Sequence, residues 1–91
     1  MIAKRAIYEG RVQGVGFRYT VKQIAMGYDV VGDVKNLADG TVELNLMGEE
    51  DEDEEFLSEI VDESTLAHHI KDTNVVEIPL LENVKGFTIS A

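Results

Sequence analysis

Apolar and polar side chains alternate along five stretches of the chain, and this period of two predicts β-strands. In the first stretch, Ala6 and Tyr8 alternate with Arg5 and Glu9. Ile7 departs from the pattern, because it is an apolar residue on the otherwise polar side. The predicted strands are residues 2–12, 30–36, 41–47, 74–80 and 86–90.

Turn and proline signals indicate how these strands connect. Asp39-Gly40 lies between the second and third predicted strands and favours a tight turn. We therefore expect these strands to form a hairpin, with Asn36 at the end of its strand. Residues 64–73 are expected to be a connection. Pro79 cannot donate a backbone hydrogen bond, so the fourth strand either ends near it or lies at an edge of the sheet.

Two other stretches carry apolar residues at spacings of three to four, which predicts amphipathic helices. The first is residues 18–28, where Val21, Ile24 and Ala25 share one face. The second is residues 49–63. The apolar residues of this second helix are Phe56, Leu57, Ile60 and Val61.

Seven consecutive acidic residues, Glu49–Glu55, open the second predicted helix. Carboxylates in a first helical turn interact favourably with the helix dipole, so we interpret the run as a solvated helix start. Asp51 and Glu54 further predict a capping box. A calcium-binding loop is excluded, since the run has no glycine at a bend and no alternating ligand spacing.

The elements follow the order strand, helix, strand, strand, helix, strand, with a short last strand. This is the order of the α+β ferredoxin-like β-α-β-β-α-β arrangement. We expect an antiparallel sheet with both helices on one face. A chain of 91 residues without linkers or repeats is expected to form one domain, residues 1–91.

The net charge of −10 is unevenly distributed. Residues 1–48 carry six basic and five acidic side chains, whereas residues 49–91 carry two basic and thirteen acidic ones. The acidic half would repel a nucleic acid, so we expect no nucleic-acid partner. The chain has no cysteine, no apolar run of membrane-spanning length and no secretion signal. We therefore expect a cytoplasmic monomer without a membrane partner.

Candidate chemistry gathers between the first strand and the first helix. Gly14 and Gly16 can adopt positive φ, so the backbone can curl and point several N–H groups into one concavity suited to an anion. The following helix N-terminus favours negative charge, and the planar guanidinium of Arg18 can hold a phosphate through two hydrogen bonds. We interpret this stretch as a candidate phosphate-binding loop. A plain glycine-rich turn with a surface arginine is the alternative, and the P-loop and dinucleotide motifs do not match.

Two segments resemble the signature of the acylphosphatase family. The first is Val12-Gln13-Gly14-Val15-Gly16-Phe17-Arg18, and the second is Gly32-Asp33-Val34-Lys35-Asn36, followed by the Asp39-Gly40 turn. The resemblance covers residues 4–48, with a weaker echo at residues 84–89. It implies that Arg18 binds the phosphate of a small acyl phosphate substrate and that Asn36 holds the attacking water.

The reaction that this resemblance implies makes modest chemical demands. An acyl phosphate releases a carboxylate, so it needs its phosphoryl charge held and a water placed in line. Five backbone amides would hold the phosphoryl oxygens together with Arg18, those of Gln13, Gly14, Val15, Gly16 and Phe17. Neither motif contains Ser, Cys, His or a metal-ligand cluster. We expect no covalent phosphoenzyme, no metal and no other cofactor, and adjacent His68 and His69 are a poor shared ligand pair.

Three places depart from the family pattern. Asp33 stands where an aromatic residue is usual, and Asp29 stands where glycine is usual. Residues 64–74 lack the glycine-proline or serine-proline pair that often precedes the fourth strand. Strand alternation predicts that Asp33 points away from Asn36, on the opposite face of the sheet.

Two other functions stay open on the sequence. One is a ferredoxin-like module that binds an anion or phosphate without turning it over. The other is an acylphosphatase-like domain of a larger enzyme that hydrolyses carbamoyl phosphate. Retention of both Arg18 and Asn36 favours the enzyme, because a sensor needs the arginine but not the asparagine. The physiological acyl group is not identified by the sequence.

Overall fold

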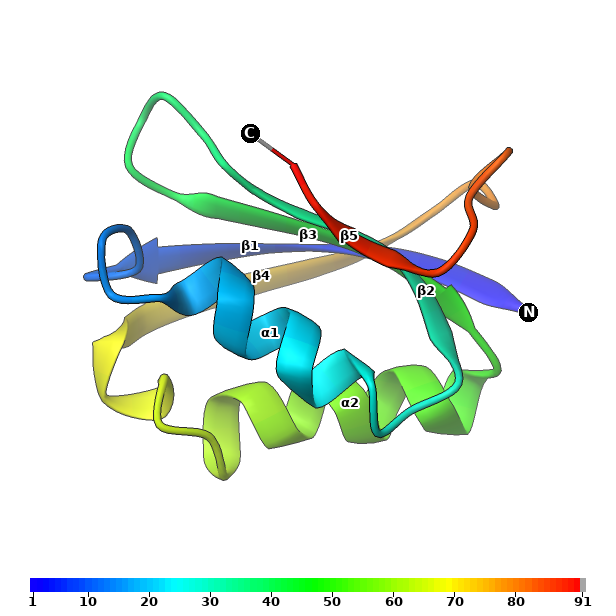
Figure 1. Cartoon of the computed structure of the whole chain (residues 1–91), viewed down its shortest axis with the longest axis horizontal. Helices are drawn as coiled ribbons and strands as arrows, with labels where there is room; N and C mark the ends of the chain where they lie inside the picture. Colours follow the sequence, from blue (N-terminus) through cyan, green and yellow to red (C-terminus); the bar gives the residue numbers. More distant parts are fainter. Residues whose placement is uncertain (91) are drawn as a thin grey trace.

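The computed structural model describes residues 1–90 and contains all the strands and helices that the sequence predicts. The strands are β1 (Ile2–Gly10), β2 (Val30–Asn36), β3 (Val42–Gly48), β4 (Ile70–Ile78) and β5 (Phe87–Ile89). The helices are α1 (Phe17–Ala25), α2 (Glu50–Asp62) and a short 3₁₀ helix, η1 (Ala67–His69). Their order and arrangement confirm the predicted α+β ferredoxin-like fold (Figure 1).

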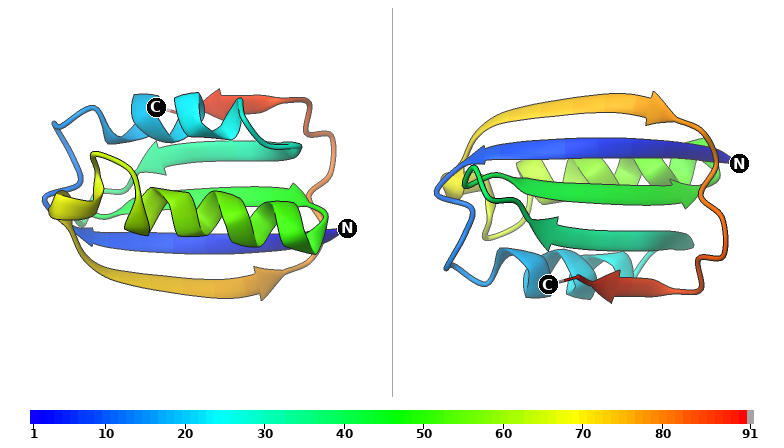
Figure 2. Two further views of the ribbon diagram at one scale, coloured as in Figure 1. Left: turned by 90° about the horizontal axis from the view of Figure 1, so that it is seen from below. Right: turned by 90° about the horizontal axis from the view of Figure 1, so that it is seen from above.

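The five strands form one sheet in the order β4-β1-β3-β2-β5. Adjacent strands are antiparallel except at one edge. There, β5 runs parallel to β2, so the expectation of a wholly antiparallel sheet is wrong in this detail. The path of the chain explains the difference. After β4, residues 79–86 cross along one end of the sheet to the opposite edge, and β5 then runs back in the direction of β2 (Figure 2).

The start of β4 also differs from the sequence prediction, which assigns residues 70–73 to a connection. Ile70 already pairs with Gly10 of β1, across a register shift in β1. Within the sheet β4 pairs with β1 alone, and most of its side chains are exposed. A strand that buries neither face shows little alternation, so its start is hidden in the sequence. Pro79 follows directly after β4, as predicted.

Both α-helices cover one face of the sheet, and the other face carries no helix within residues 1–90 (Figures 1 and 2). The largest wholly buried side chains include Tyr8, Phe17, Leu44, Phe56 and Ile60. The rings of Tyr8 and Phe17 lie 5.1 Å apart between centroids, which holds the first residue of α1 against β1. Burying an aromatic side chain of this size contributes about 1.5–3 kcal/mol, so this contact stabilises the start of α1 on the sheet. No helix in the described chain has the length and apolar character needed to cross a membrane.

The predicted capping box at the start of α2 is wrong. The helix begins at Glu50 with Glu49 at the N-cap position, and no side chain caps it. The carboxylate of Asp51 instead accepts a hydrogen bond from the neighbouring Glu52 amide at 3.0 Å. The first turn begins too early for Asp51 to act as a cap, because the Asp53 amide already donates to the Glu49 carbonyl at 3.0 Å.

Asp53 is the one member of the acidic run that the structure buries completely. Neither of its carboxylate oxygens has a hydrogen-bond partner among the described residues. The side chain packs against Gly48, where a Cβ would lie 3.0 Å from Asp53 Oδ1. Burial raises the pKa of Asp53 to about 6, and the positive charge of Lys4 opposes this rise. The prediction of a solvated helix start is therefore wrong for this residue.

Replacing Asp53 by Asn is expected to raise the free energy of unfolding at pH 7 by on the order of 1–3 kcal/mol. The unfolded carboxyl ionises near pH 4 and the folded one near pH 6, so wild-type stability falls as the pH rises through this window. The variant should lack that fall. Thermal unfolding from pH 3.5 to 7.5 measures the difference, with Asp51→Asn as the exposed control. A difference in Tm that is the same at every pH would rule Asp53 out as the titrating group.

Candidate active site

The chain between β1 and α1 curls at two glycines whose backbone lies in the left-handed region. Gly14 has a φ of 78° and Gly16 a φ of 76°. Residues other than glycine rarely adopt this backbone conformation. Apart from the adjacent residues, no atom lies within 4 Å of a Cβ built at either position, so the backbone angle rather than crowding calls for glycine. The curl that the sequence predicts is therefore confirmed.

The first turn of α1 is open to an anion. Gly16 occupies the N-cap position, and no side chain caps the helix or places a carboxylate in its first turn. The first N–H groups of a helix have no partner within it, and the helix dipole favours negative charge at this end. These amides follow directly on the curled loop, so the loop and the helix N-terminus are adjacent in the chain.

The side chain of Gln13 clamps the curled loop to the β2–β3 hairpin. Its Nε2 donates to the carbonyl oxygens of Leu37 and Thr41, each at 2.8 Å. Leu37 follows Asn36 directly, so this clamp ties the loop to the end of β2. The sequence predicts a role only for the Gln13 backbone amide. The side-chain contact could not be predicted, because its two acceptors are backbone carbonyls of a hairpin that is distant in the sequence.

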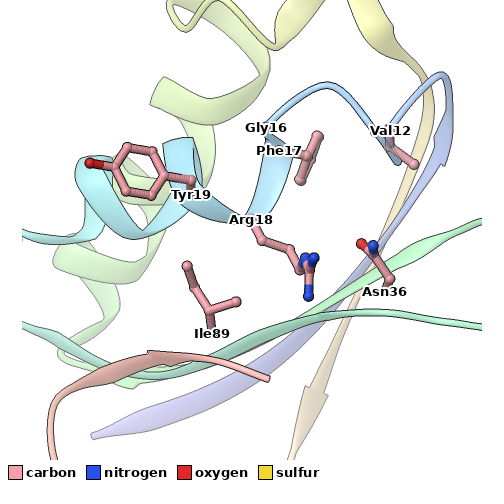
Figure 3. A pocket seen from close by; sticks show the side chains of 8 residues that line it. Val12, Gly16, Phe17, Arg18, Tyr19, Asn36 and Ile89 are labelled. Carbon is pink, nitrogen blue, oxygen red and sulfur yellow. The ribbon is translucent and has the colours of Figure 1, made fainter. Parts of the chain in front are cut away.

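Arg18 and Asn36 reach one cavity from two different elements. Arg18 lies in the first turn of α1, and Asn36 is the last residue of β2. Figure 3 shows both side chains extending toward the same space. The cavity has a volume of about 190 Å³, and among the described residues no carboxylate and no second lysine or arginine lines it. Arg18 Nη1 also donates to the carbonyl of Ser90 at 2.9 Å, which fixes one side of the guanidinium.

The structure brings most of the predicted site residues to this cavity. Gly14, Gly16 and Phe17 line it together with Arg18 and Asn36. Gln13 and Val15 do not line it: Gln13 clamps the loop, and the Val15 side chain is exposed. A contribution of their backbone amides to phosphate binding therefore stays a prediction.

The cavity also includes residues that the sequence does not single out. Val12 belongs to the loop between β1 and α1 and is wholly buried, whereas Tyr19 and Ile89 line the cavity and are exposed (Figure 3). Ser90 contacts Arg18 through its backbone carbonyl. The weaker family echo ends one residue before Ser90, and a carbonyl carries no side-chain signature, so no pattern in the sequence could identify this contact.

Two of the departures from the family pattern have a structural account. Asp33 accepts hydrogen bonds from Asn45 and Ser90 and does not line the cavity, as strand alternation predicts. Asp29 does not adopt the positive φ that would favour glycine. Its amide donates to Glu52 Oε1 at 2.7 Å, which holds the turn after α1 against α2.

The histidine pair lies apart from this cavity. His68 and His69 belong to η1 and line a separate depression with Arg11 and Lys71. Within residues 1–90, no cluster of three or more histidine or carboxylate side chains has an arrangement that could hold a metal ion.

Relatives by sequence identify the family of this chain. A family model described as Acylphosphatase matches residues 4–89. An acylphosphatase of Clostridium beijerinckii is 39% identical over 89 residues, which cover 98% of each chain. An acylphosphatase of Enterococcus faecalis is 40% identical over 81 residues, which cover 89% of each chain.

Solved structures lead to the same family. The crystal structure of acylphosphatase from Bacillus subtilis matches with a TM-score of 0.89 at 37% identity and covers 100% of both chains. The crystal structure of T. kodakarensis HypF matches with a TM-score of 0.85 at 31% identity, over 100% of this chain but 12% of that longer one. A family match over nearly the whole length, with relatives similar from end to end, shows that this chain belongs to the acylphosphatase family, the hydrolases of acyl phosphates.

Proposed function

We propose that Arg18 and the amides of residues 13–17 bind the phosphoryl group, and that a water held by Asn36 attacks phosphorus in line with the leaving carboxylate. One phosphorus–oxygen bond forms to the water as the bond to the carboxylate oxygen breaks. The products are the carboxylate and inorganic phosphate, and the protons of the water pass to phosphate and solvent. The observation that carries this proposal is that Arg18 and Asn36 face one cavity from α1 and β2.

The arrangement suits a substrate with a good leaving group. A carboxylate departs without a proton, so no general acid with a raised pKa is needed. Positioned donors that meet the charge on the phosphoryl oxygens lower the barrier because they do not reorganise during the reaction. The curled loop, the helix N-terminus and the anchored guanidinium are donors of this kind.

The acyl part of the substrate is proposed to extend out of the cavity. The space between the loop and Asn36 is small, about 190 Å³. Tyr19 and Ile89 border it and are 62% and 39% exposed. An acyl group passing over two exposed side chains would meet few steric limits, so we expect the enzyme to accept acyl groups of different size.

The proposal extends to the oligomeric state, the cellular compartment and the partners of the enzyme. We expect residues 1–91 to act as a single domain and a monomer, since one chain supplies both Arg18 and Asn36. The absence of cysteine fits a reducing compartment, and we propose the cytoplasm. The net charge of −10 disfavours a nucleic-acid partner.

Hydrolysis of benzoyl phosphate in water enriched in oxygen-18 tests the proposed point of attack. Attack on phosphorus is expected to place the label in inorganic phosphate and none in benzoate. Mass spectrometry of both products measures this, with an enzyme-free reaction as the control. Label in benzoate above that control would mean attack on the carbonyl carbon and would refute the proposed role of Asn36.

A further inference from the structure

The helix-free face of the sheet carries a row of polar side chains that crosses three strands. Asp33 of β2 lies opposite Asn45 of β3, and Asn45 lies opposite Arg5 of β1. Arg5 Nε donates to Asn45 Oδ1 at 2.9 Å, and Asn45 Nδ2 donates to Asp33 Oδ1 at 3.2 Å. The bond from Asn45 orients the Asp33 carboxylate and leaves its second oxygen, Oδ2, free to accept another hydrogen bond.

That second oxygen holds Ser90. The Ser90 hydroxyl donates to Asp33 Oδ2 at 3.0 Å, and the Ser90 amide donates to the Val34 carbonyl at 2.9 Å. The Ser90 carbonyl in turn accepts the hydrogen bond from Arg18 Nη1 at 2.9 Å. A continuous chain of hydrogen bonds therefore runs from the helix-free face, around the edge of the sheet, to the cation of the cavity.

We propose that Asp33 is a positioning residue that acts through Ser90 to hold the Arg18 guanidinium in its phosphate-binding orientation. This inference rests on the proposed role of Arg18. It also gives a function to the carboxylate that stands where the family usually has an aromatic residue. Asp33 does this without placing charge in the cavity, because it lies on the opposite face of the sheet from Asn36.

The geometry of β5 explains why such a support matters. β5 has three residues, lies at the edge of the sheet and pairs with β2 alone. Short edge strands contribute few hydrogen bonds and fray readily. Without the bond to Asp33, the hydrogen bonds of Ser90 that the structure shows are the one from its amide to Val34 and the one that its carbonyl accepts from Arg18, so the sheet itself holds Ser90 through a single bond. An arginine side chain loses considerable rotamer freedom when fixed, so a pre-formed anchor lowers the cost of binding phosphate.

Binding of inorganic phosphate tests the inference without any need for turnover. Asp33→Ala is expected to raise the Kd for phosphate about 3- to 10-fold, the scale of one lost hydrogen bond to a charged or ordered group. Ser90→Ala should produce a loss of similar size. Asp33→Asn keeps one oxygen that can accept the Ser90 hydroxyl but turns its NH2 group toward the Asn45 NH2 donor, so its loss should be smaller than that of Asp33→Ala. Isothermal titration calorimetry, well below the melting temperature of each variant, measures these values.

A double-mutant cycle tells whether Asp33 acts on Arg18 through Ser90 or through a general effect on the fold. If Asp33 acts through the Ser90 hydroxyl, Asp33→Ala adds nothing further in a Ser90→Ala background. Asp72→Ala is the matched control, since it removes a carboxylate from the same face, on β4, that has no hydrogen bond in the described structure. Independent, additive effects of Asp33→Ala and Ser90→Ala would overturn the inference, as would an unchanged Kd in Asp33→Ala.

The same titrations show which proposal fails. If Arg18→Ala weakens phosphate binding but Asp33→Ala does not, the positioning role of Asp33 is wrong and the role of Arg18 stands. If Arg18→Ala leaves phosphate binding unchanged, the proposed function itself is wrong at this residue. The steady-state constants add a further readout, because a misplaced guanidinium should raise KM for benzoyl phosphate and also lower kcat.

Discussion

Arg18→Ala is expected to lower kcat/KM for benzoyl phosphate by about 10²–10³-fold, by analogy with the loss of one donor from an oxyanion hole. Among the described residues, the Arg18 guanidinium is the sole cation that lines the cavity. Its removal takes positive charge from the bound phosphate and from the transition state alike. Phosphate affinity should therefore fall together with turnover. Steady-state kinetics and calorimetric titration with inorganic phosphate measure the two effects.

Arg18→Lys and Lys22→Ala are the matched controls for this prediction. A lysine provides a point charge that cannot grip phosphate with two parallel hydrogen bonds, so Arg18→Lys should restore little activity. Lys22 lies one turn further along α1 and does not line the cavity, so Lys22→Ala should leave kcat/KM unchanged. Wild-type phosphate affinity in Arg18→Ala would disprove the assigned role.

Asn36→Ala is expected to lower kcat by about 10²-fold, the scale of the loss when a reacting group is no longer held in position. The carboxamide is assigned to the water and not to the phosphoryl group. The Kd for inorganic phosphate should therefore stay within a factor of about two of the wild-type value, and the loss should fall on kcat. This separation of binding from turnover is the opposite of the result expected for Arg18→Ala.

Asn74→Ala provides the control for the loss of an asparagine side chain from a strand. Asn74 lies in β4, opposite Ile7, and does not line the cavity. Its replacement should leave both kcat and the Kd for phosphate unchanged. If Asn36→Ala weakened phosphate binding as strongly as turnover, Asn36 would be a phosphate ligand and the assignment of the water to it would be wrong.

The sequence predicts an element correctly where buried and exposed residues alternate with a regular period. Where they do not, the bounds or the direction of the strand cannot be predicted. In β3, the apolar residues Val42, Leu44 and Leu46 are buried on the face that packs against the helices, whereas the intervening residues face the other side, where Asn45 alone is buried. β4 is an exposed edge strand, so the polar residues Lys71 and Asp72 gave no sign that pairing had already begun. The parallel placement of β5 depends on where residues 79–86 cross the end of the sheet, which no local pattern specifies.

The buried carboxylate of α2 was missed although the chain carries a signal for it. Asp53 precedes Phe56 by three positions and Ile60 by seven, and all three are wholly buried. This spacing places them on one face of a helix. Within the run of seven acidic residues, the helical phase of the apolar residues that follow narrows the inward-facing acid to Asp53 or Glu52, which precede Phe56 by three and four positions.

The candidate site divides in the same way between local and distant features. Gly14, Gly16 and Arg18 lie within five residues, and their order predicts a curled loop followed by a helix with an arginine in its first turn, which the structure contains. The partner that holds Arg18 is a backbone carbonyl 72 residues away. Distant contacts of this kind depend on the register of β5 against β2, and register emerges only when the whole sheet is assembled.

Release of inorganic phosphate from benzoyl phosphate by the wild-type protein is the most direct test of the central claim. The measurement should be made on a preparation whose Kd for inorganic phosphate is known, so that an intact anion site is established first. We predict saturable release of one phosphate and one benzoate per substrate, with inorganic phosphate as a competitive inhibitor. A protein that binds phosphate yet releases none above the rate in buffer would be an anion-binding module, and the catalytic roles assigned to Arg18 and Asn36 would be wrong.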